Sequence, residues 1–299
     1  MRRALPGFAL AALTIAVSFV LLVALRAADG FAWKEAPGGK LRLIENGRHV
    51  LDYNFGPQLM PGVPEDRRRE GYIYPLFSPA GVNPLDDFPK DHFHHRGVFW
   101  AWMSIGFEGK TYDLWTLKPG IEHRFHKFLK QSASANAASL RVENGWYVGN
   151  RLIVRETVDL AVPRSGENER NVDLAVRLDA VTKDVVIAGS PDDAKGYGGL
   201  CVRFGPRDET RILTPEGPVT ANENEVPHAW AAMEALFSGK RAGLRVSSDP
   251  SNPRHPPGWC LRPYGFVGAN FPGLQPYTLA PGQPLLLRYR VTVYDGTRP

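Results

Sequence analysis

The sequence predicts an all-β protein built as one large antiparallel β-sandwich. Apolar and polar residues alternate with the period of two that a half-buried strand requires, most clearly over residues 171–179. Asn-Gly pairs lie between β-rich runs, and 30 Gly and 26 Pro residues separate short segments throughout the 299-residue chain. Short alternating segments divided by turn residues are typical of β-sandwiches, so we expect a single sandwich of this class.

The first predicted elements form a hairpin. Residues 41–45 and 48–53 flank Asn46 and Gly47, which both tolerate the positive φ of a type I′ turn. Residues 71–77 predict a further strand, because aromatic and β-branched side chains dominate this stretch.

Later segments continue the pattern. Asn144-Gly145 predicts another hairpin turn, and strands are expected at residues 152–158, 171–179 and 287–293. Residues 228–237 are rich in Ala, Met, Glu and Leu and favour a short helix, although tertiary contacts can convert such a stretch to a strand.

Residues 1–28 have the pattern of a targeting segment. Arg2 and Arg3 precede an uncharged apolar run at residues 8–25. This pattern predicts a signal peptide, and a run of about 18 residues is also long enough for an uncleaved membrane anchor. In either case the positive-inside rule predicts that the single domain at residues 29–299 is exported, periplasmic or extracellular, with membrane contact only through residues 8–25.

The charge pattern argues against a nucleic-acid partner. The formal net charge is +5, and it falls to +2 without the three arginines of residues 1–28. The chain has no Lys/Arg-rich helix and no repeat of basic and aromatic residues. The run at residues 67–69, three arginines between Asp66 and Glu70, is predicted to be a solvated loop.

The chain has two cysteines, Cys201 and Cys260. In an oxidising compartment they could form a disulfide, which would close a loop of about 60 residues and stabilise the fold by about 3–4 kcal/mol. Two buried free thiols are the equally open alternative.

The densest group of chemically active side chains lies at residues 86–97. Three of the eight histidines fall within four positions, as His92, His94 and His95, and Arg96 follows them directly. If the segment is extended, alternation places His92 and His94 on one face and His95 on the other. Because histidine titrates near neutral pH, these three residues and Arg96 are the candidate catalytic residues.

Three further segments carry candidate substrate-binding residues. Two tryptophans after the histidines alternate onto one face and could stack on a sugar ring. A glycine-rich segment and the Pro-rich loop at residues 251–265 supply arginines, which can hold carboxylates or vicinal oxygens bidentately. The candidates are Trp100, Trp102, Tyr197, Arg203, Arg254, His255 and Arg262.

Four motifs together carry a family resemblance. Residues 72–81, 91–97, 195–200 and 252–265 resemble, in this order, the bacterial family labelled methane oxygenase PmoA-like, a domain of unknown function. The residues that match its motifs are His92, His94, His95, Arg96, Tyr197, Arg254 and Arg262. The resemblance implies an exported β-sandwich associated with carbohydrate breakdown, similar to the galactose-mutarotase-like supersandwich. A methane monooxygenase subunit needs several membrane-spanning helices, so true oxygenase activity is not expected.

These observations favour a carbohydrate-active enzyme that performs acid/base chemistry on a small-molecule or oligosaccharide ligand. The two catalytic carboxylates of most glycoside hydrolases are not evident, apart from Asp86, Asp87 and Asp91. Their absence favours lyase, epimerase or mutarotase-like chemistry over retaining hydrolysis.

Two alternatives remain open. The first is a non-catalytic glycan-binding module. The second is a metalloprotein in which His92 and His94, with His123 or His255, hold a divalent Zn²⁺ or Cu²⁺ ion, although His-X-His alone is a weak metal signal. The sequence by itself requires no cofactor.

Overall fold

The protein is a sandwich of two nine-stranded antiparallel sheets, and the predicted all-β fold is confirmed. The computed structural model describes residues 29–190 and 194–298, so both alternatives for residues 1–28, signal peptide or anchor, lie outside the described residues. Within the described ranges, no helix is long and apolar enough to cross a membrane. The one helix described there is a single 3-10 turn, Glu65–Arg67.

The first sheet has the strand order β1-β2-β3-β4-β5-β13-β20-β19-β16. Its strands are β1 (Phe31–Ala36), β2 (Lys40–Glu45), β3 (Arg48–Asn54), β4 (Tyr72–Leu76), β5 (Val98–Trp102), β13 (Gly198–Arg203), β16 (Glu223–Pro227), β19 (Gly258–Arg262) and β20 (Phe266–Asn270).

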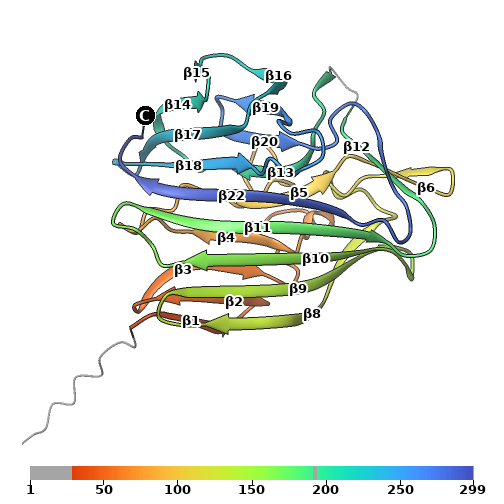
Figure 1. The fold of residues 1–299 in the computed structure, drawn as a ribbon, viewed down its shortest axis with the longest axis horizontal. Coiled ribbons are helices and arrows are strands. Elements are labelled where there is room, and N and C mark those ends of the chain that lie inside the picture. Colours follow the sequence, from red (N-terminus) through yellow and green to blue (C-terminus); the bar gives the residue numbers. More distant parts are fainter. Residues whose placement is uncertain (1–28, 191–193, 299) are drawn as a thin grey trace, which may run out of the picture.

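The second sheet has the order β15-β14-β17-β18-β22-β11-β10-β9-β8 and lies in front of the first in Figure 1. Its strands are β8 (Glu122–Ala133), β9 (Ala137–Val148), β10 (Arg151–Pro163), β11 (Glu169–Ala180), β14 (Asp208–Thr214), β15 (Gly217–Val219), β17 (Trp230–Phe237), β18 (Lys240–Ser248) and β22 (Leu285–Asp295). A four-stranded sheet at the right of Figure 1 contains β6 (Ser104–Phe107), β7 (Lys110–Tyr112), β12 (Val185–Ala188) and β21 (Tyr277–Leu279).

The main core fills the space between the two large sheets. On β11, Val172, Leu174, Val176 and Leu178 are buried while the residues between them are more exposed, as the alternation predicted. Burial of these side chains is the main force that holds the sheets together.

The first sheet also buries part of its outer face. All five residues of β5 are buried, because a second apolar cluster covers the side of the sheet that points away from the main core. This second cluster contains Tyr72, Phe99, Ala101, Trp115, Cys201, Cys260 and Phe266. Residues 86–97 and Trp115 lie over this part of the sheet, and they carry the histidines described below.

Two turn predictions had different outcomes. Asn46 and Gly47 have φ values of 50° and 79° and join β2 to β3, so the first hairpin is confirmed. The turn at Asn144-Gly145 is wrong, because β9 continues through both residues. Asn144 is buried and its amide nitrogen donates to the hydroxyl of Tyr53 (3.3 Å) and to Glu156 (2.9 Å), so its side-chain donors are satisfied inside the strand.

The predicted helix at residues 228–237 is also wrong. Trp230–Phe237 forms β17, which pairs with β14 on one side and β18 on the other. Two neighbouring strands satisfy its backbone groups, and this tertiary pairing outweighs a weak helix propensity.

Cys201 and Cys260 are buried free thiols. Each lies directly opposite Gly268, on either side of β20, so the two cysteines are two strand spacings apart. That separation is about 9–10 Å, which exceeds the span of a disulfide. The disulfide alternative is therefore wrong, and the free-thiol alternative is confirmed.

Candidate functional site

The histidine-rich segment is a loop of two successive turns. The backbone amide of His92 donates to the carbonyl of Pro89, and that of His95 to the carbonyl of His92, both at 2.9 Å. The extended segment considered from the sequence is therefore wrong, and so is the assignment of His95 to an opposite face. The rings of His92 and His95 are stacked, with centroids 4.6 Å apart, and His94 lies edge-on to both. We call His92, His94 and His95 the histidine cluster.

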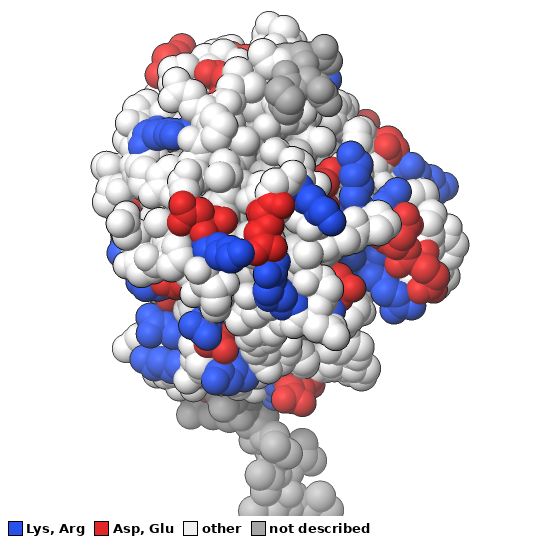
Figure 2. Space-filling model, turned by 90° about the vertical axis from the view of Figure 1, so that its right-hand side faces the viewer, with Lys and Arg blue, Asp and Glu red and all other residues white. Residues whose placement is uncertain are grey.

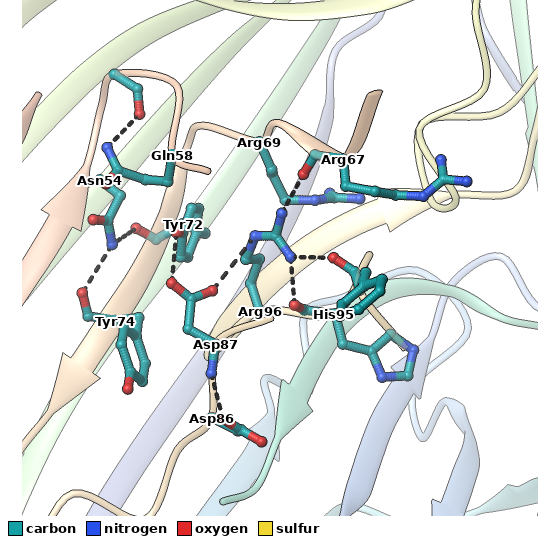
Figure 3. A network of polar contacts seen from close by, with 12 residues as sticks. Asn54, Gln58, Arg67, Arg69, Tyr72, Tyr74, Asp86, Asp87, His95 and Arg96 are labelled. Atoms are coloured by element: carbon teal, nitrogen blue, oxygen red, sulfur yellow. Dashed lines mark hydrogen bonds and ion pairs between the residues drawn. The ribbon is translucent and has the colours of Figure 1, made fainter. Parts of the chain in front are cut away.

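Arg96 connects this loop to the segment of Arg67 and to Asp87 (Figure 3). Its guanidinium donates to the carbonyls of Phe93 (2.7 Å), His95 (2.7 Å) and Arg67 (2.5 Å), and its Nε lies 3.4 Å from the carboxylate of Asp87. The side chain is fully buried. Arg96 thus positions the loop, and the catalytic role predicted for it stays a prediction.

The neighbouring carboxylates, those of Asp86 and Asp87, interact with other groups of the protein. Burial raises the pKa of Asp87 to about 7, although Arg96 and the hydroxyl of Tyr72, which donates to Asp87 at 2.9 Å, act in the opposite direction. Asp86 accepts from the backbone amide of Asp87, and burial raises its pKa as well. These two residues form part of the network in Figure 3 rather than a pair facing an open site.

Two of the cluster imidazoles, those of His94 and His95, are held neutral. Burial, followed by the positive charge of Arg69, lowers the pKa of His94 to about 3, and burial lowers the pKa of His95 well below its usual value. Among the described residues, neither ring nitrogen of His94 has a hydrogen-bond partner, and His94 is only partly buried. A neutral imidazole with a free nitrogen can accept a proton or a hydrogen bond.

Asp91 links the cluster to Arg203. Arg203 donates to both carboxylate oxygens of Asp91 at 2.7 and 2.8 Å, and the Nδ1 of His92 lies 3.0 Å from one of them. This second contact lacks hydrogen-bond geometry. Burial raises the pKa of Asp91, but the contacts with Arg203 and His92 outweigh burial, and the pKa is lowered overall. Asp91 thus joins His92 to Arg203.

Tyr264 forms the exposed edge of the site. Its ring stacks on His92, with centroids 5.5 Å apart and planes 4° from parallel, and the residue is 42% exposed. The guanidinium of Arg203 lies 5.0 Å from the same ring. Tyr264 belongs to one of the motifs in the sequence, but no role was predicted for it. The exposure of its side chain could not be read from the sequence.

Tyr197 and Arg262 join the cluster through aromatic contacts. Trp115 and Phe266 both contact the ring of His95, at 6.0 and 5.1 Å, and the ring of Tyr197, at 5.3 and 5.7 Å. The Nε of Arg262 donates to the hydroxyl of Tyr197 at 3.2 Å. The structure therefore brings Tyr197, Arg203 and Arg262 to the histidine cluster. No sequence signal indicated Trp115.

Other candidates lie elsewhere. Trp100 and Trp102 point into the main core, on the opposite side of β5 from the histidines, and the Trp102 indole donates to the carbonyl of Phe271. Arg254 donates to three carbonyls of residues 272–276, and the Nδ1 of His255 lies 3.3 Å from Ser248. The substrate-binding roles predicted for these four residues stay predictions without support from the site geometry.

The metal alternative lacks a ligand set. In the part of the chain that the structure describes, no group of three or more His, Cys, Asp or Glu residues is arranged to hold a metal ion. His123, the third candidate ligand, instead places its Nε2 2.9 Å from the buried carboxylate of Glu156.

The exposed charges do not form a nucleic-acid footprint on the side shown in Figure 2. There, Lys and Arg side chains are interspersed with Asp and Glu.

A family model matches most of the chain. It is the model of DUF6807, a family of unknown function, and it matches residues 40–298. The chain belongs to this family. The match supports the resemblance to a domain of unknown function, and it gives no support to the PmoA-like name. No curated protein matches the chain by sequence.

Several solved structures are similar in fold. A heparan sulfate lyase HepC mutant from Pedobacter heparinus has 10% identity and a TM-score of 0.41, with 90% of this chain and 37% of that chain covered. An alpha-galactosidase from Lactobacillus brevis has 10% identity and a TM-score of 0.42, with 90% and 38% covered. A GalM/aldose epimerase homologue from C. elegans has 8% identity and a TM-score of 0.35, with 91% and 100% covered. This DUF6807 chain thus spans just over a third of the first two proteins.

Proposed function

We propose that this protein is an exported carbohydrate-active enzyme whose histidine cluster performs acid/base chemistry on a sugar. The observation that carries the proposal is the contact of three imidazole rings beside an exposed tyrosine, with the ring nitrogens of His94 unpartnered among the described residues. The apolar run at residues 8–25 supports export. The motif resemblance of residues 91–97 supports carbohydrate as the substrate class.

The geometry divides the roles between two histidines. His94 is held neutral by burial and by Arg69, so it is the base. His92 lies beside His94, with one carboxylate oxygen of Asp91 3.0 Å from its Nδ1, and we assign it the role of the acid. Two adjacent imidazoles are an arrangement that can transfer protons in both directions.

The surrounding side chains are suited to bind a sugar. The exposed ring of Tyr264 offers a face for the apolar side of a pyranose, next to polar groups that can contact hydroxyls. Arg262 donates to the oxygen of Tyr197, and burial raises the pKa of that hydroxyl, so the neutral hydroxyl keeps its own proton to donate.

The carboxylates favour proton transfer over retaining hydrolysis. Asp87 is engaged by Arg96 and Tyr72, and Asp91 by Arg203 and His92. A retaining hydrolase needs two carboxyl groups facing one glycosidic bond. We therefore propose a lyase, epimerase or mutarotase-like reaction.

The test is a screen of the purified protein against a panel of mono- and oligosaccharides, with proton NMR to detect anomeric exchange, unsaturated products or released sugars. We expect turnover that falls by about 10²–10⁴ in kcat in His94→Gln. His126→Gln is the matched control, because His126 contacts Tyr147 on β8 and β9 instead of the cluster. Saturable glycan binding without any turnover would refute the enzyme and favour the glycan-binding module.

A further inference from the structure

A cavity of about 480 Å³ opens where the first sheet separates, apart from the histidine cluster. β4 and β5 pair at a single position, Ile73 with Val98. Beyond this position the two strands separate, and Gly71, next to β4, and Trp100, on β5, line the cavity. Its other walls come from residues 65–70 and 114–124 and from Trp146 on β9. The volume is large enough for one or two sugar-sized rings.

Arg69 lines this cavity and is electrostatically unusual. The residue is 8% exposed, and its Nη2 donates to the carbonyls of Leu114 (2.8 Å) and Trp115 (2.7 Å). Its Nε is buried without a hydrogen-bond partner, and no carboxylate among the described residues lies within ion-pair distance of its guanidinium. Arg69 was predicted to lie in a solvated loop, and that prediction is wrong.

The other buried arginines have compensating contacts that Arg69 lacks. Arg96, Arg170 and Arg203 each have a carboxylate within 3.4 Å, and Arg262, which has none, has hydrogen bonds on all three guanidinium nitrogens. Arg69 has neither form of compensation. Burial, together with the nearby charge of Arg96, lowers the pKa of Arg69 to about 9, the direction expected for a buried cation without a counter-charge.

A second donor without a partner lies in the wall of the same cavity, on His123. The Nε2 of His123 lies 2.9 Å from Glu156, and although burial lowers it, the charge of Glu156 raises the pKa of His123 above its usual value. In the protonated ring Nδ1 also carries a hydrogen, and this Nδ1 is buried without a partner. Glu156 is fully engaged, since Asn144 (2.9 Å) and Trp146 (3.1 Å) also donate to it.

Other charged side chains around the cavity form ion pairs. Arg68 pairs with Glu65 at 2.5 Å and Arg124 with Glu122 at 2.8 Å. Among the described residues Glu70 lines the cavity without an ion pair; its carboxyl accepts from the backbone amide of Phe125, and burial raises its pKa, which favours the neutral form. The Nε of Arg69 and the Nδ1 of His123 are thus the donors without a partner, and Arg69 is the cation without a counter-charge. Trp100 and Trp146 form the apolar wall.

We propose that this cavity binds a sugar acid of one ring, with its carboxylate between Arg69 and His123 and its ring against the two tryptophans. A carboxylate supplies the counter-charge and the acceptors that the protein itself does not. The charged side chains at the entrance, such as Lys118 and Asp66, can contact the hydroxyls of the ring. The cavity lining does not include the histidine cluster, although the charge of Arg69 also acts on His94.

The test uses isothermal titration calorimetry of the wild-type protein at pH 7 with three probes. We expect D-glucuronate to bind with one-to-one stoichiometry and D-glucose to bind at least about tenfold more weakly, because only the first carries a charge-assisted acceptor. Equal affinities for glucuronate and glucose, or no binding of glucuronate at millimolar concentration, would overturn the proposal. Benzoate that binds as tightly as glucuronate would overturn the sugar class and leave an aromatic acid as the ligand.

The variant Arg69→Met separates a binding role from a structural one. We expect at least a tenfold loss of glucuronate affinity and a smaller fall in Tm than in Arg170→Met, because the variant loses two hydrogen bonds to carbonyls but also removes a buried charge that has no counter-charge. Arg170→Met is the control: it strands the buried Glu45, so it should lower Tm and keep the affinity. A lowered Tm with unchanged affinity in Arg69→Met would show that Arg69 only supports the loop. If this variant does not fold, the glucuronate and glucose comparison on wild-type protein still decides.

Discussion

Replacing Arg96 by Met tests the account of the loop that carries the histidines. Arg96 donates three hydrogen bonds to carbonyls of residues 67–95 and lies beside the buried Asp87. The loss of three charge-assisted hydrogen bonds should cost about 3–5 kcal/mol of unfolding free energy at pH 6. Asp87 adds a second, pH-dependent cost.

The direction of this second cost follows from the proton on Asp87. Its pKa is raised from 3.8 to about 7, so the folded protein keeps a proton that the unfolded chain releases, and wild-type stability falls as pH rises between these values. Above pH 7 the wild-type loss levels off, because the folded carboxyl then ionises beside Arg96. Without Arg96 the folded pKa rises further and the loss continues, which adds about 2 kcal/mol between pH 7 and 8.5.

The assay is urea unfolding of wild type and Arg96→Met at pH 6, 7 and 8.5, compared as differences so that other titrating groups cancel. The double variant Asp87→Asn/Arg96→Met is the control, because it has no carboxyl to titrate and its difference from Asp87→Asn should not grow with pH. A difference between Arg96→Met and wild type that stays constant from pH 7 to 8.5 would refute the proposed coupling of Arg96 and Asp87.

Two further predictions concern titration and thiol chemistry. The pKa of His94 is lowered to about 3, so its neutral ring contributes stability that is present above about pH 6.5 and lost as pH falls. In urea unfolding between pH 6.5 and 5, the unfolding free energy of wild type should therefore fall by about 1.4 kcal/mol per pH unit more than that of His94→Gln. Parallel curves for the two proteins would contradict this. Alkylation of denatured protein should label both Cys201 and Cys260 whether or not reductant is present, measured by mass; labelling that needs reductant would show a disulfide.

Part of the site could be found from the sequence. The density of His92, His94 and His95 pointed to the candidate site, and the motifs around Tyr197 and Arg262 contain residues that the fold brings to it. The alternation rule then failed for the histidines, because Pro89 and the following turns break the strand that the rule assumes. The single loop predicted at residues 251–265 is wrong, because β19 (Gly258–Arg262) separates Arg254 and His255 from Tyr264, and the side chains of Arg254 and His255 contact other segments.

The sequence by itself determined the all-β class, because an alternating pattern of side chains can bury one face only as a strand. It also determined where chemically active groups are concentrated. The tertiary structure alone decided that Cys201 and Cys260 stay apart across β20, that Trp102 belongs to the core, and that Arg69 is buried beside a cavity without a counter-charge. These properties depend on which distant strands become neighbours, and burial, pairing and pKa arise from those neighbours rather than from the local sequence.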